Sequence, residues 1–182
     1  MLVLVGPSAS GKTEVAKYLI KNYGMRKLVT YTTRPMRVGE VEGVDYHFVN
    51  HDFFLEKIPQ NFFLETVEYN NQFYGTAFED LAPDKVVILE PNGVKNYLAK
   101  VPKEIKICYL KTPIEYRYKR MLARGDDEES IQKRLAGDDA IFTSELETLA
   151  DWTILSDDIS VGEMAEWIYQ KYQPNLKSKP SM

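Results

Sequence analysis

Near the N-terminus runs Gly6-Pro7-Ser8-Ala9-Ser10-Gly11-Lys12-Thr13, and this stretch decides the fold of the chain. It matches G-x-x-x-x-G-K-[ST], the pattern of a loop that cradles phosphate. The apolar run Leu2 to Val5 before it is typical of a buried parallel strand. The pattern from about Gly11 to Tyr23 predicts a helix, which Gly24 is placed to end. A chance glycine-rich turn is disfavoured, because strand, loop and helix occur in the required order.

Such a loop predicts a nucleoside triphosphate site. Its backbone N–H groups turn inward around a phosphate, and the helix N-terminus adds partial positive charge. Lys12 is expected to reach the outer phosphates of ATP, and the Thr13 hydroxyl is expected to ligate Mg²⁺. The ATP-binding residues that the motif predicts are Gly6, Ser8, Ala9, Ser10, Gly11, Lys12 and Thr13.

The rest of the chain alternates apolar runs with helical patterns. Further strands are expected at Lys85 to Leu89, at Ile105 to Leu110 and, more weakly, at Asp151 to Leu155. This alternation predicts an α/β fold with a parallel sheet and helices on both faces. Helices are expected at Pro113 to Ala123, at about Asp127 to Ala150, and at Val161 to Tyr172 behind a capping box of Ser160 and Glu163.

Residues 30–82 interrupt this alternation. Short strands are expected at Tyr46 to Val49, Phe62 to Glu68 and Gln72 to Thr76. Asn70-Asn71 is a plausible turn between the last two, and Asn50 is placed to cap a short helix from His51 to Ile58. We interpret the segment as a mostly antiparallel lobe inserted into the α/β core.

The composition limits the kinds of partner. The 182 residues are 44% hydrophobic, which suits one compact unit. The net charge of -4 attracts neither nucleic acid nor an anionic membrane, so local basic clusters must hold any phosphate-bearing ligand. Cys108 is the sole cysteine and is expected in the core, while His47 and His51 lack metal-ligand spacing. We therefore expect no disulfide within the chain, no structural metal, and, without a signal segment, a cytoplasmic location.

A second basic cluster lies in Thr30-Tyr31-Thr32-Thr33-Arg34-Pro35-Met36-Arg37. Arginine forks pair bidentately with phosphate oxygens, and hydroxyl groups satisfy the remaining acceptors. Tyr46 could donate another hydrogen bond. Taken alone, such a cluster is more often a solvated turn than a site.

The order of the motifs along the chain strengthens the prediction that this second cluster binds a phosphate. The chain contains G-P-S-A-S-G-K-T, T-T-R-P-M-R-V-G-E-V-E-G-V-D-Y-H-F-V, F-F-L-E, F-Y-G-T and R-G-D-D-E-E-S-I-Q-K-R-L in that order. In this it resembles the guanylate kinase family over nearly its whole length, most specifically from Thr32 to Val49. The resemblance implies a P-loop NTPase-type parallel sheet flanked by helices, an inserted GMP-binding lobe and a helical lid. It also implies MgATP-dependent phosphorylation of GMP and dGMP to GDP and dGDP.

The resemblance also implies roles for individual residues. Arg34, Arg37, Tyr46 and Tyr74 would hold the GMP phosphate, with Thr30 in the place of a family serine. Glu65 and Thr76 would read the base, because one carboxylate accepts both the ring N–H and the exocyclic NH₂ of guanine. A solvated glutamate on an exposed strand is the alternative for Glu65. The implied GMP-binding residues are Thr30, Arg34, Arg37, Tyr46, Glu65, Tyr74, Gly75, Thr76 and Glu90.

The expected lid carries several arginines. Arg117, Arg120 and Arg124 lie at i, i+3 and i+7 of one predicted helix, and Arg134 lies on the next, which Asp126 is placed to cap. These arginines form either a charged, solvated face or a lid that closes on the phosphates. The resemblance implies ATP binding by Arg120 and Arg124, and it implies that the catalytic residues are Lys12, Arg34, Arg124 and Arg134.

Some positions depart from the family pattern. Ile88 replaces the first of two usual acids, while Glu90 keeps the acidic type of the second. Ser156 stands where asparagine is usual, and Thr66 where tryptophan is frequent. These changes bear on substrate preference and rate more than on reaction class.

The expected organisation is a single domain, active as a monomer or homodimer on small-molecule nucleotides. Its core would comprise residues 1–29 and 83–173, with the lid at about 124–134, the inserted lobe at 30–82 and a flexible tail at 174–182. Two other functions remain open. One is a non-catalytic binding module of the same family, which the presence of Lys12 and Thr13 disfavours. The other is a kinase for another phosphorylated acceptor such as a ribose bisphosphate, which would leave Glu65 and Thr76 without a base to read.

Overall fold

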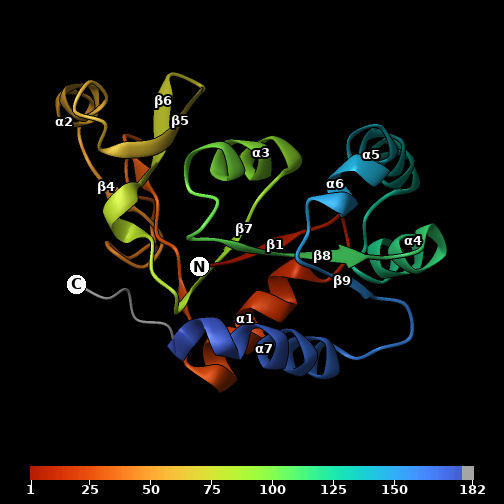
Figure 1. The fold of residues 1–182 in the computed structure, drawn as a ribbon. Coiled ribbons are helices and arrows are strands. Elements are labelled where there is room, and N and C mark those ends of the chain that lie inside the picture. Colours follow the sequence, from red (N-terminus) through yellow and green to blue (C-terminus); the bar gives the residue numbers. More distant parts are fainter. Residues whose placement is uncertain (178–182) are drawn as a thin grey trace.

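The apolar run before the phosphate loop forms the central strand of a parallel sheet. The structure, a computed structural model, describes residues 1–177. The sheet comprises β1 (Leu2–Val5), β2 (Arg26–Lys27), β7 (Lys85–Ile88), β8 (Lys106–Lys111) and β9 (Trp152–Leu155). Its order is β2-β7-β1-β8-β9, and each neighbouring pair is parallel (Figure 1). The predicted α/β fold with a parallel sheet is therefore confirmed.

Helices cover both faces of the sheet. On one face, α1 (Lys12–Tyr23) and α7 (Val161–Lys177) pack against side chains that include Leu2 and Leu4. On the other face, α3 (Pro91–Lys100) and α6 (Ser144–Thr148) pack against side chains that include Val3 and Val5. Successive residues of a strand point to opposite faces, so a strand covered on both sides must be apolar throughout. This is why β1 has no polar residue.

The inserted lobe is a small second sheet. Its elements are β3 (Tyr31–Thr32), β4 (His47–Phe48), α2 (His51–Lys57), β5 (Phe63–Tyr69), β6 (Gln72–Ala77) and a 3₁₀ turn at Phe78–Asp80. The order is β4-β3-β6-β5, with β3 and β5 both antiparallel to β6 and only β3 and β4 parallel. Asn70 and Asn71 both have positive φ angles, of 50° and 57°, as a two-residue hairpin turn requires. The expectation of a mostly antiparallel lobe is confirmed.

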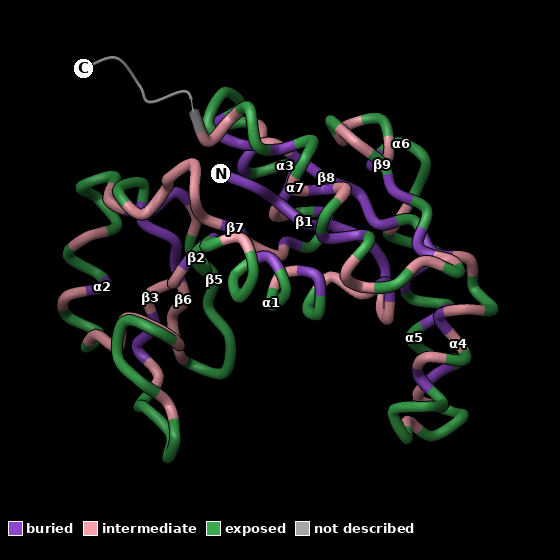
Figure 2. Tube along the Cα trace, turned by 90° about the horizontal axis from the view of Figure 1, so that it is seen from below, coloured by how far each residue is buried: buried purple, intermediate pink, exposed green. Residues whose placement is uncertain are grey.

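Two arms extend from the core. The inserted lobe is one, and the other is a helical arm made of α4 (Ile114–Ala123) and α5 (Glu128–Ile141). Figure 2 shows them at opposite sides of the central strands, with buried chain concentrated in the sheet and mostly exposed or half-buried chain in the arms. Arms with few buried contacts are the parts of a fold that move at the lowest cost in free energy.

Several predicted helix ends are confirmed. Gly24 is the C-cap of α1, and the Asn50 side chain accepts a hydrogen bond from the Phe53 N–H at 2.7 Å. The Ser160 and Glu163 capping box forms, with the Glu163 N–H donating to Ser160 Oγ at 3.2 Å and the Ser160 N–H donating to Glu163 Oε2 at 3.0 Å. These features depend on neighbouring residues alone, which is why sequence patterns identify them.

The expected helix from about Asp127 to Ala150 is wrong in its length. It is divided into α5 and α6, with Thr143 as the N-cap residue of the second helix. The N-cap of α5 is Asp127 rather than Asp126: its side chain accepts from the Ser130 N–H at 2.9 Å. Asp126 does not cap because its carboxylate is already engaged by Arg124.

The expected end of the last helix is also wrong. Helix α7 continues past Tyr172 to Lys177, so residues 174–177 are helical rather than a flexible tail. The Tyr172 hydroxyl donates to the Pro83 carbonyl at 2.6 Å, and Leu176 packs against the core, which ties this end of the helix to the sheet. The remainder of the expected tail, 178–182, lies outside the described residues.

Cys108 lies in the core, as expected. It is fully buried in β8, and burial raises the pKa of its thiol to about 12. The thiol is therefore an inert packing group rather than a nucleophile. Among residues 1–177, no helix combines the length and apolar character needed to cross a membrane.

Candidate active site

The phosphate loop joins β1 to α1 in a tightly constrained path. A Cβ atom on Gly6 would lie 2.6 Å from the Leu110 carbonyl oxygen, so only glycine lets the loop run this close to β8. Ala9 has a φ of 58°, an uncommon value for a residue with a side chain. Strained backbone of this kind is concentrated at functional sites, where the surrounding structure enforces it.

Lys12 lies across the mouth of this loop. Its ammonium donates to the carbonyl oxygens of Gly6 at 2.5 Å and Pro7 at 2.8 Å. Burial lowers the pKa of Lys12, while the negative charges of Glu90 and Asp138 oppose that shift. The predicted phosphate ligand of the loop is therefore bound to the loop's own carbonyl oxygens.

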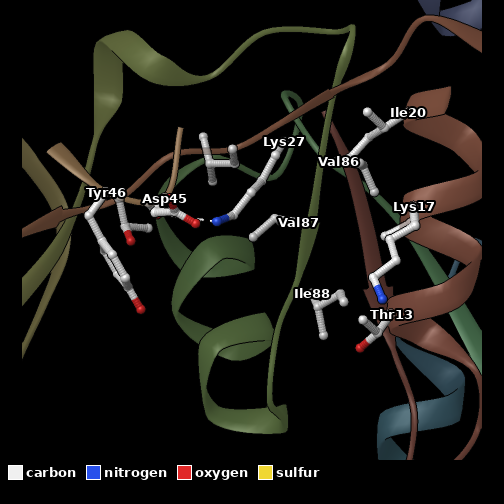
Figure 3. A pocket seen from close by; sticks show the side chains of 12 residues that line it. Thr13, Lys17, Ile20, Lys27, Asp45, Tyr46, Val86, Val87 and Ile88 are labelled. Atoms are coloured by element: carbon white, nitrogen blue, oxygen red, sulfur yellow. Dashed lines mark hydrogen bonds between the residues drawn. The ribbon is translucent and has the colours of Figure 1, made fainter. Parts of the chain in front are cut away.

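A cavity of about 440 Å³ joins the phosphate-loop helix to the inserted lobe (Figure 3). Figure 3 shows Thr13 and Lys17 on α1 at one side, β7 along the wall, and Tyr46 at the other side. Thr30 also lines this cavity. The cavity therefore brings Thr13, the predicted Mg²⁺ ligand, into one space with two predicted GMP-binding residues.

A second cavity, of about 530 Å³, also borders Thr13. Residues 9–14, Arg120, Arg124, 159–161 and Met164 line it. Thr13 lines both cavities, so they meet at the start of α1. Residues 9–13 of the predicted ATP-binding loop thus face one space with the two lid arginines, whereas Gly6 and Ser8 do not line it.

Arg120 is already bound to the loop. It donates to the Ala9 carbonyl at 3.2 Å and to Ser156 Oγ at 3.0 Å. Ser156 is fully buried and donates in turn to the Ser10 carbonyl at 3.1 Å. Burial lowers the pKa of Arg120, and the nearby charge of Asp157 opposes the shift. Arg120 therefore supports the loop in addition to lining the cavity.

Asp126 brings Arg124 and Arg134 together. Arg124 Nε donates to Asp126 Oδ1 at 3.0 Å, and Arg134 Nη1 lies 3.9 Å from Asp126 Oδ2. The hydrogen bond from Arg124 lowers the pKa of Asp126. Both predicted lid arginines are on the surface, where they can exchange this carboxylate for a phosphate.

Arg117 matches neither alternative weighed for these arginines, a solvated face or a lid that closes on the phosphates. It is 4% exposed and pairs with Asp138, away from Arg124. The spacing i, i+3, i+7 correctly predicted that the arginines follow one helix. However, the N-terminal part of α4, which carries Arg117, packs against α5.

The second basic cluster is assembled around Arg34. Its guanidinium donates to the two oxygens of Glu40 at 2.7 Å and 3.1 Å, which holds the pKa of Glu40 below its usual range. The guanidinium carbon lies 5.4 Å from the Tyr46 ring centroid, and that ring lies 6.0 Å from the ring of Tyr74. The Arg37 side chain is exposed, while its N–H donates to Glu40 at 2.7 Å. Arg34 and Arg37 thus bind one acidic side chain, and the two predicted tyrosines lie beside Arg34.

Glu65 and Thr76 lie side by side on β5 and β6, where they are register partners. Thr76 is buried and accepts a hydrogen bond from the Tyr97 hydroxyl at 3.1 Å. Gly75 is confined next to them, since a Cβ there would lie 2.9 Å from both Phe54 and Phe63. Both predicted base-reading residues therefore face α3.

Three residues of α3 support Glu65, and sequence reasoning missed all of them. Burial raises the pKa of the Glu65 carboxyl, while hydrogen bonds with Asn96 and Tyr97 and the charge of Lys100 oppose this shift. The Lys100 ammonium also donates to the Leu64 carbonyl. Their close spacing on one helix was the signal that could have indicated a shared contact. The sequence around them does not show which strand this part of the helix faces.

Glu90 stands at the N-cap position of α3, and it lines a third cavity of about 410 Å³ that also contains Lys95 and Glu145. The negative charge of Glu90 raises the pKa of Lys12, so the carboxylate is within electrostatic range of the phosphate loop. Glu90 therefore lies nearer the phosphate loop, whereas Glu65 and Thr76, the predicted base-reading residues, are register partners in the inserted lobe.

The comparisons with known proteins agree on one family. The family model for guanylate kinase matches residues 1–168. A guanylate kinase of Wolinella succinogenes is 39% identical over 144 residues, which cover 74% of this chain and 67% of the relative. A guanylate kinase of Helicobacter hepaticus is 32% identical over 177 residues, covering 91% of this chain and 86% of the relative.

Solved structures show the same fold. The crystal structure of guanylate kinase from Anaplasma phagocytophilum has a TM-score of 0.64 and 24% identity. The match covers 98% of this chain and 87% of the Anaplasma chain. A shikimate kinase from Acinetobacter baumannii, in complex with shikimate, has a TM-score of 0.54 and 16% identity. The match covers 97% of this chain and 94% of the shikimate kinase chain.

Proposed function

Because this chain belongs to the guanylate kinase family, we propose that it phosphorylates GMP and dGMP with ATP, using the phosphate loop as donor site and the Arg34 cluster as acceptor site. One observation supports this arrangement above the others. A single cavity is lined by Thr13 from the phosphate-loop helix and by Thr30 and Tyr46 from the inserted lobe. Two anion-binding clusters that border one space can bring two phosphates into contact.

The reaction needs no covalent intermediate with the protein. An oxygen of the GMP phosphate attacks the γ-phosphorus of ATP, a new O–P bond forms, and the bond to the leaving ADP oxygen breaks. Lys12 and the loop amides hold the transferred group, while Arg34 and Arg37 hold the attacking phosphate. Arg124 and Arg134 add positive charge once the phosphates replace Asp126 as their partner. Closure of the two arms excludes water, which would otherwise hydrolyse ATP.

The donor set fits Mg²⁺ shared between protein and nucleotide. Mg²⁺ prefers oxygen ligands and commonly takes one or two from the protein, with phosphates and water supplying the rest. The Thr13 hydroxyl is at the N-terminus of α1, where both cavities meet, and the Glu90 carboxylate is close enough to act on Lys12. In the described part of the chain, no group of three or more histidine, cysteine, aspartate or glutamate residues could hold a metal by itself. When bound, Mg²⁺ neutralises negative charge on the phosphates.

The paired residues Glu65 and Thr76 favour guanine over the alternative acceptors. The ionised carboxylate of Glu65 accepts two parallel N–H bonds from guanine, whereas adenine presents a lone pair at the same edge and is repelled. A ribose bisphosphate would leave these residues unused. A non-catalytic module would not need Lys12 at the mouth of the loop. The substrates are metabolites of the cytoplasm, and we place the protein there.

A coupled ADP-release assay tests the proposal. GMP, dGMP, AMP, UMP, dTMP and a ribose bisphosphate are offered separately with MgATP. Efficient turnover is expected with GMP and dGMP only. Turnover with the sugar bisphosphate and not with GMP would replace the proposed acceptor, and absence of turnover with every acceptor would support the non-catalytic module.

A further inference from the structure

The helical arm contains one ion pair that is almost fully buried. Arg117 of α4 and Asp138 of α5 are 4% and 7% exposed, and Arg117 Nη2 donates to Asp138 Oδ2. The exposed Asp139 is a weaker neighbour, with its Oδ1 3.8 Å from Arg117 Nη1. Burying two charges costs free energy that their mutual attraction often only balances, so stability alone does not explain the pair.

The same two side chains bind every polar group of Ser8 in the phosphate loop. Ser8 N–H donates to Asp138 Oδ2 at 2.9 Å, and Ser8 Oγ donates to Asp138 Oδ1 at 3.2 Å. The Ser8 carbonyl accepts from Arg117 Nε at 3.1 Å. The Ser8 peptide is thus held on both sides, directly before the strained backbone of Ala9.

This contact connects three segments that are distant in the sequence. The loop follows β1, Arg117 lies on α4, and Asp138 lies on α5, four residues after Arg134 (Figure 1). Helix α4 also carries Arg120, which donates to the Ala9 carbonyl. The orientation of the phosphate loop and the packing of the helical arm are consequently linked through Ser8 and Ala9.

We propose that Arg117 and Asp138 form a positioning pair that sets the orientation of the phosphate loop and links it to the arm carrying Arg124 and Arg134. The proposal rests on the proposed function, since it assigns the loop to ATP. Neither side chain needs to touch the nucleotide. Their role is to hold the Ser8 peptide so that the amide groups after it point at phosphate.

The charges of the pair are as important as its hydrogen bonds. Asp138 raises the pKa of the Lys12 ammonium and Arg117 lowers it, so the two charges oppose each other at the anion site. Loss of Arg117 alone leaves an unpaired carboxylate beside the triphosphate site, which repels ATP. Loss of the Asp138 charge alone leaves an unpaired arginine beside the same site, and its positive charge does not repel ATP. A pair that served folding only would show no such asymmetry in ATP binding.

An apolar replacement separates positioning from folding. Arg117→Leu/Asp138→Ala removes both charges together, a change that buried ion pairs often tolerate without loss of stability. Binding of a fluorescent ATP analogue and of GMP is measured separately, well below the thermal midpoint of each variant. We expect the dissociation constant of the ATP analogue to rise at least about tenfold, as for other losses of positioning, and that of GMP to change less than about twofold.

A matched control uses another arginine–aspartate pair. Arg26 Nε and Nη2 donate to Asp84 at 2.6 Å and 3.0 Å at the far edge of the sheet. Arg26→Leu/Asp84→Ala should leave the binding of both nucleotides unchanged. Native ATP binding in Arg117→Leu/Asp138→Ala would overturn the proposal, and so would equal losses of ATP and GMP binding.

Single variants keep the test decisive if the double variant does not fold. Arg117→Met should weaken binding of the ATP analogue more than Asp138→Asn, which retains an acceptor for the Ser8 N–H. The reverse order, or changes below about threefold in both, would contradict the proposal. These binding measurements do not require turnover, so a protein that fails to phosphorylate GMP would refute the proposed function without affecting this test.

Discussion

Glu65 provides the sharpest test of how the base is recognised. Replacing it with glutamine keeps the size and shape of the side chain but changes what it offers to guanine. A carboxylate accepts hydrogen bonds from both N–H groups of the guanine edge. A glutamine accepts one and turns its own NH₂ donor toward the other, so two donors face each other.

The expected loss follows from the environment of this side chain. A hydrogen bond to a charged group contributes about 1.5–3 kcal/mol, which corresponds to about 10- to 150-fold in kcat/KM. Thr76 and Tyr97 beside it are buried, which strengthens the interaction, but Glu65 itself is half-buried. We therefore expect Glu65→Gln to reduce kcat/KM for GMP by about 10- to 50-fold. For AMP, the glutamine NH₂ can donate to the ring nitrogen, so its kcat/KM should stay equal or increase.

The assay is coupled ADP release with GMP and with AMP as acceptors, at a fixed saturating concentration of MgATP. Glu68→Gln is the matched control, because Glu68 lies on the same strand and is exposed. It should behave as the native protein with both acceptors. The reasoning is wrong if Glu65→Gln keeps the native ratio of GMP to AMP turnover, or if Glu68→Gln changes it equally.

Four further predictions concern the phosphates and the pH. Lys12→Met should lower kcat by at least about 100-fold while leaving GMP binding, measured by calorimetry, intact; weakened GMP binding would mean that Lys12 is a structural residue. The raised pKa of Glu65 means that its carboxylate is protonated at a higher pH than an exposed glutamate, so KM for GMP should rise early as the pH falls. When KM for GMP is measured across this pH range, the rise at low pH should be absent in Glu65→Gln. If both proteins show the rise, a group other than Glu65 causes it. Asp126→Asn should free Arg124 and Arg134 and lower KM for ATP by less than about tenfold, an effect that added salt diminishes; an increased KM would show instead that Asp126 orients them. Chelation of Mg²⁺ should stop turnover and added Mg²⁺ restore it, whereas full activity in the chelator would exclude Thr13 as a ligand of an essential metal.

Local patterns accounted for the parts of the fold whose physics is local. The phosphate loop, the Asn70-Asn71 turn and the Ser160 capping box each depend on a few consecutive residues. Their conformations follow from glycine, asparagine or a hydroxyl at the required position, whatever packs on them afterwards. The order of the motifs was enough to indicate the guanylate kinase family.

Side-chain partners were harder to predict because they depend on distant segments. Arg117 was expected either on a solvated face or in a lid that closes on the phosphates. It is instead buried against Asp138, since the arginine spacing does not show which part of the helix is covered. Asp126 was expected to cap α5 and instead pairs with Arg124, because a carboxylate can bind whichever donor is nearer. The support of Glu65 by Asn96, Tyr97 and Lys100 needs the contact between α3 and β5.

The sequence by itself determined that a phosphate loop follows a buried strand, that an arginine turn lies in an inserted lobe, and that both belong to one α/β unit. Only the tertiary structure decided that Thr13, Thr30 and Tyr46 line one cavity and that Ser8 is held between Arg117 and Asp138. The physical reason is range: backbone conformation follows from neighbours in the chain, whereas a hydrogen bond or a cavity wall needs residues that meet only after the sheet and helices have packed.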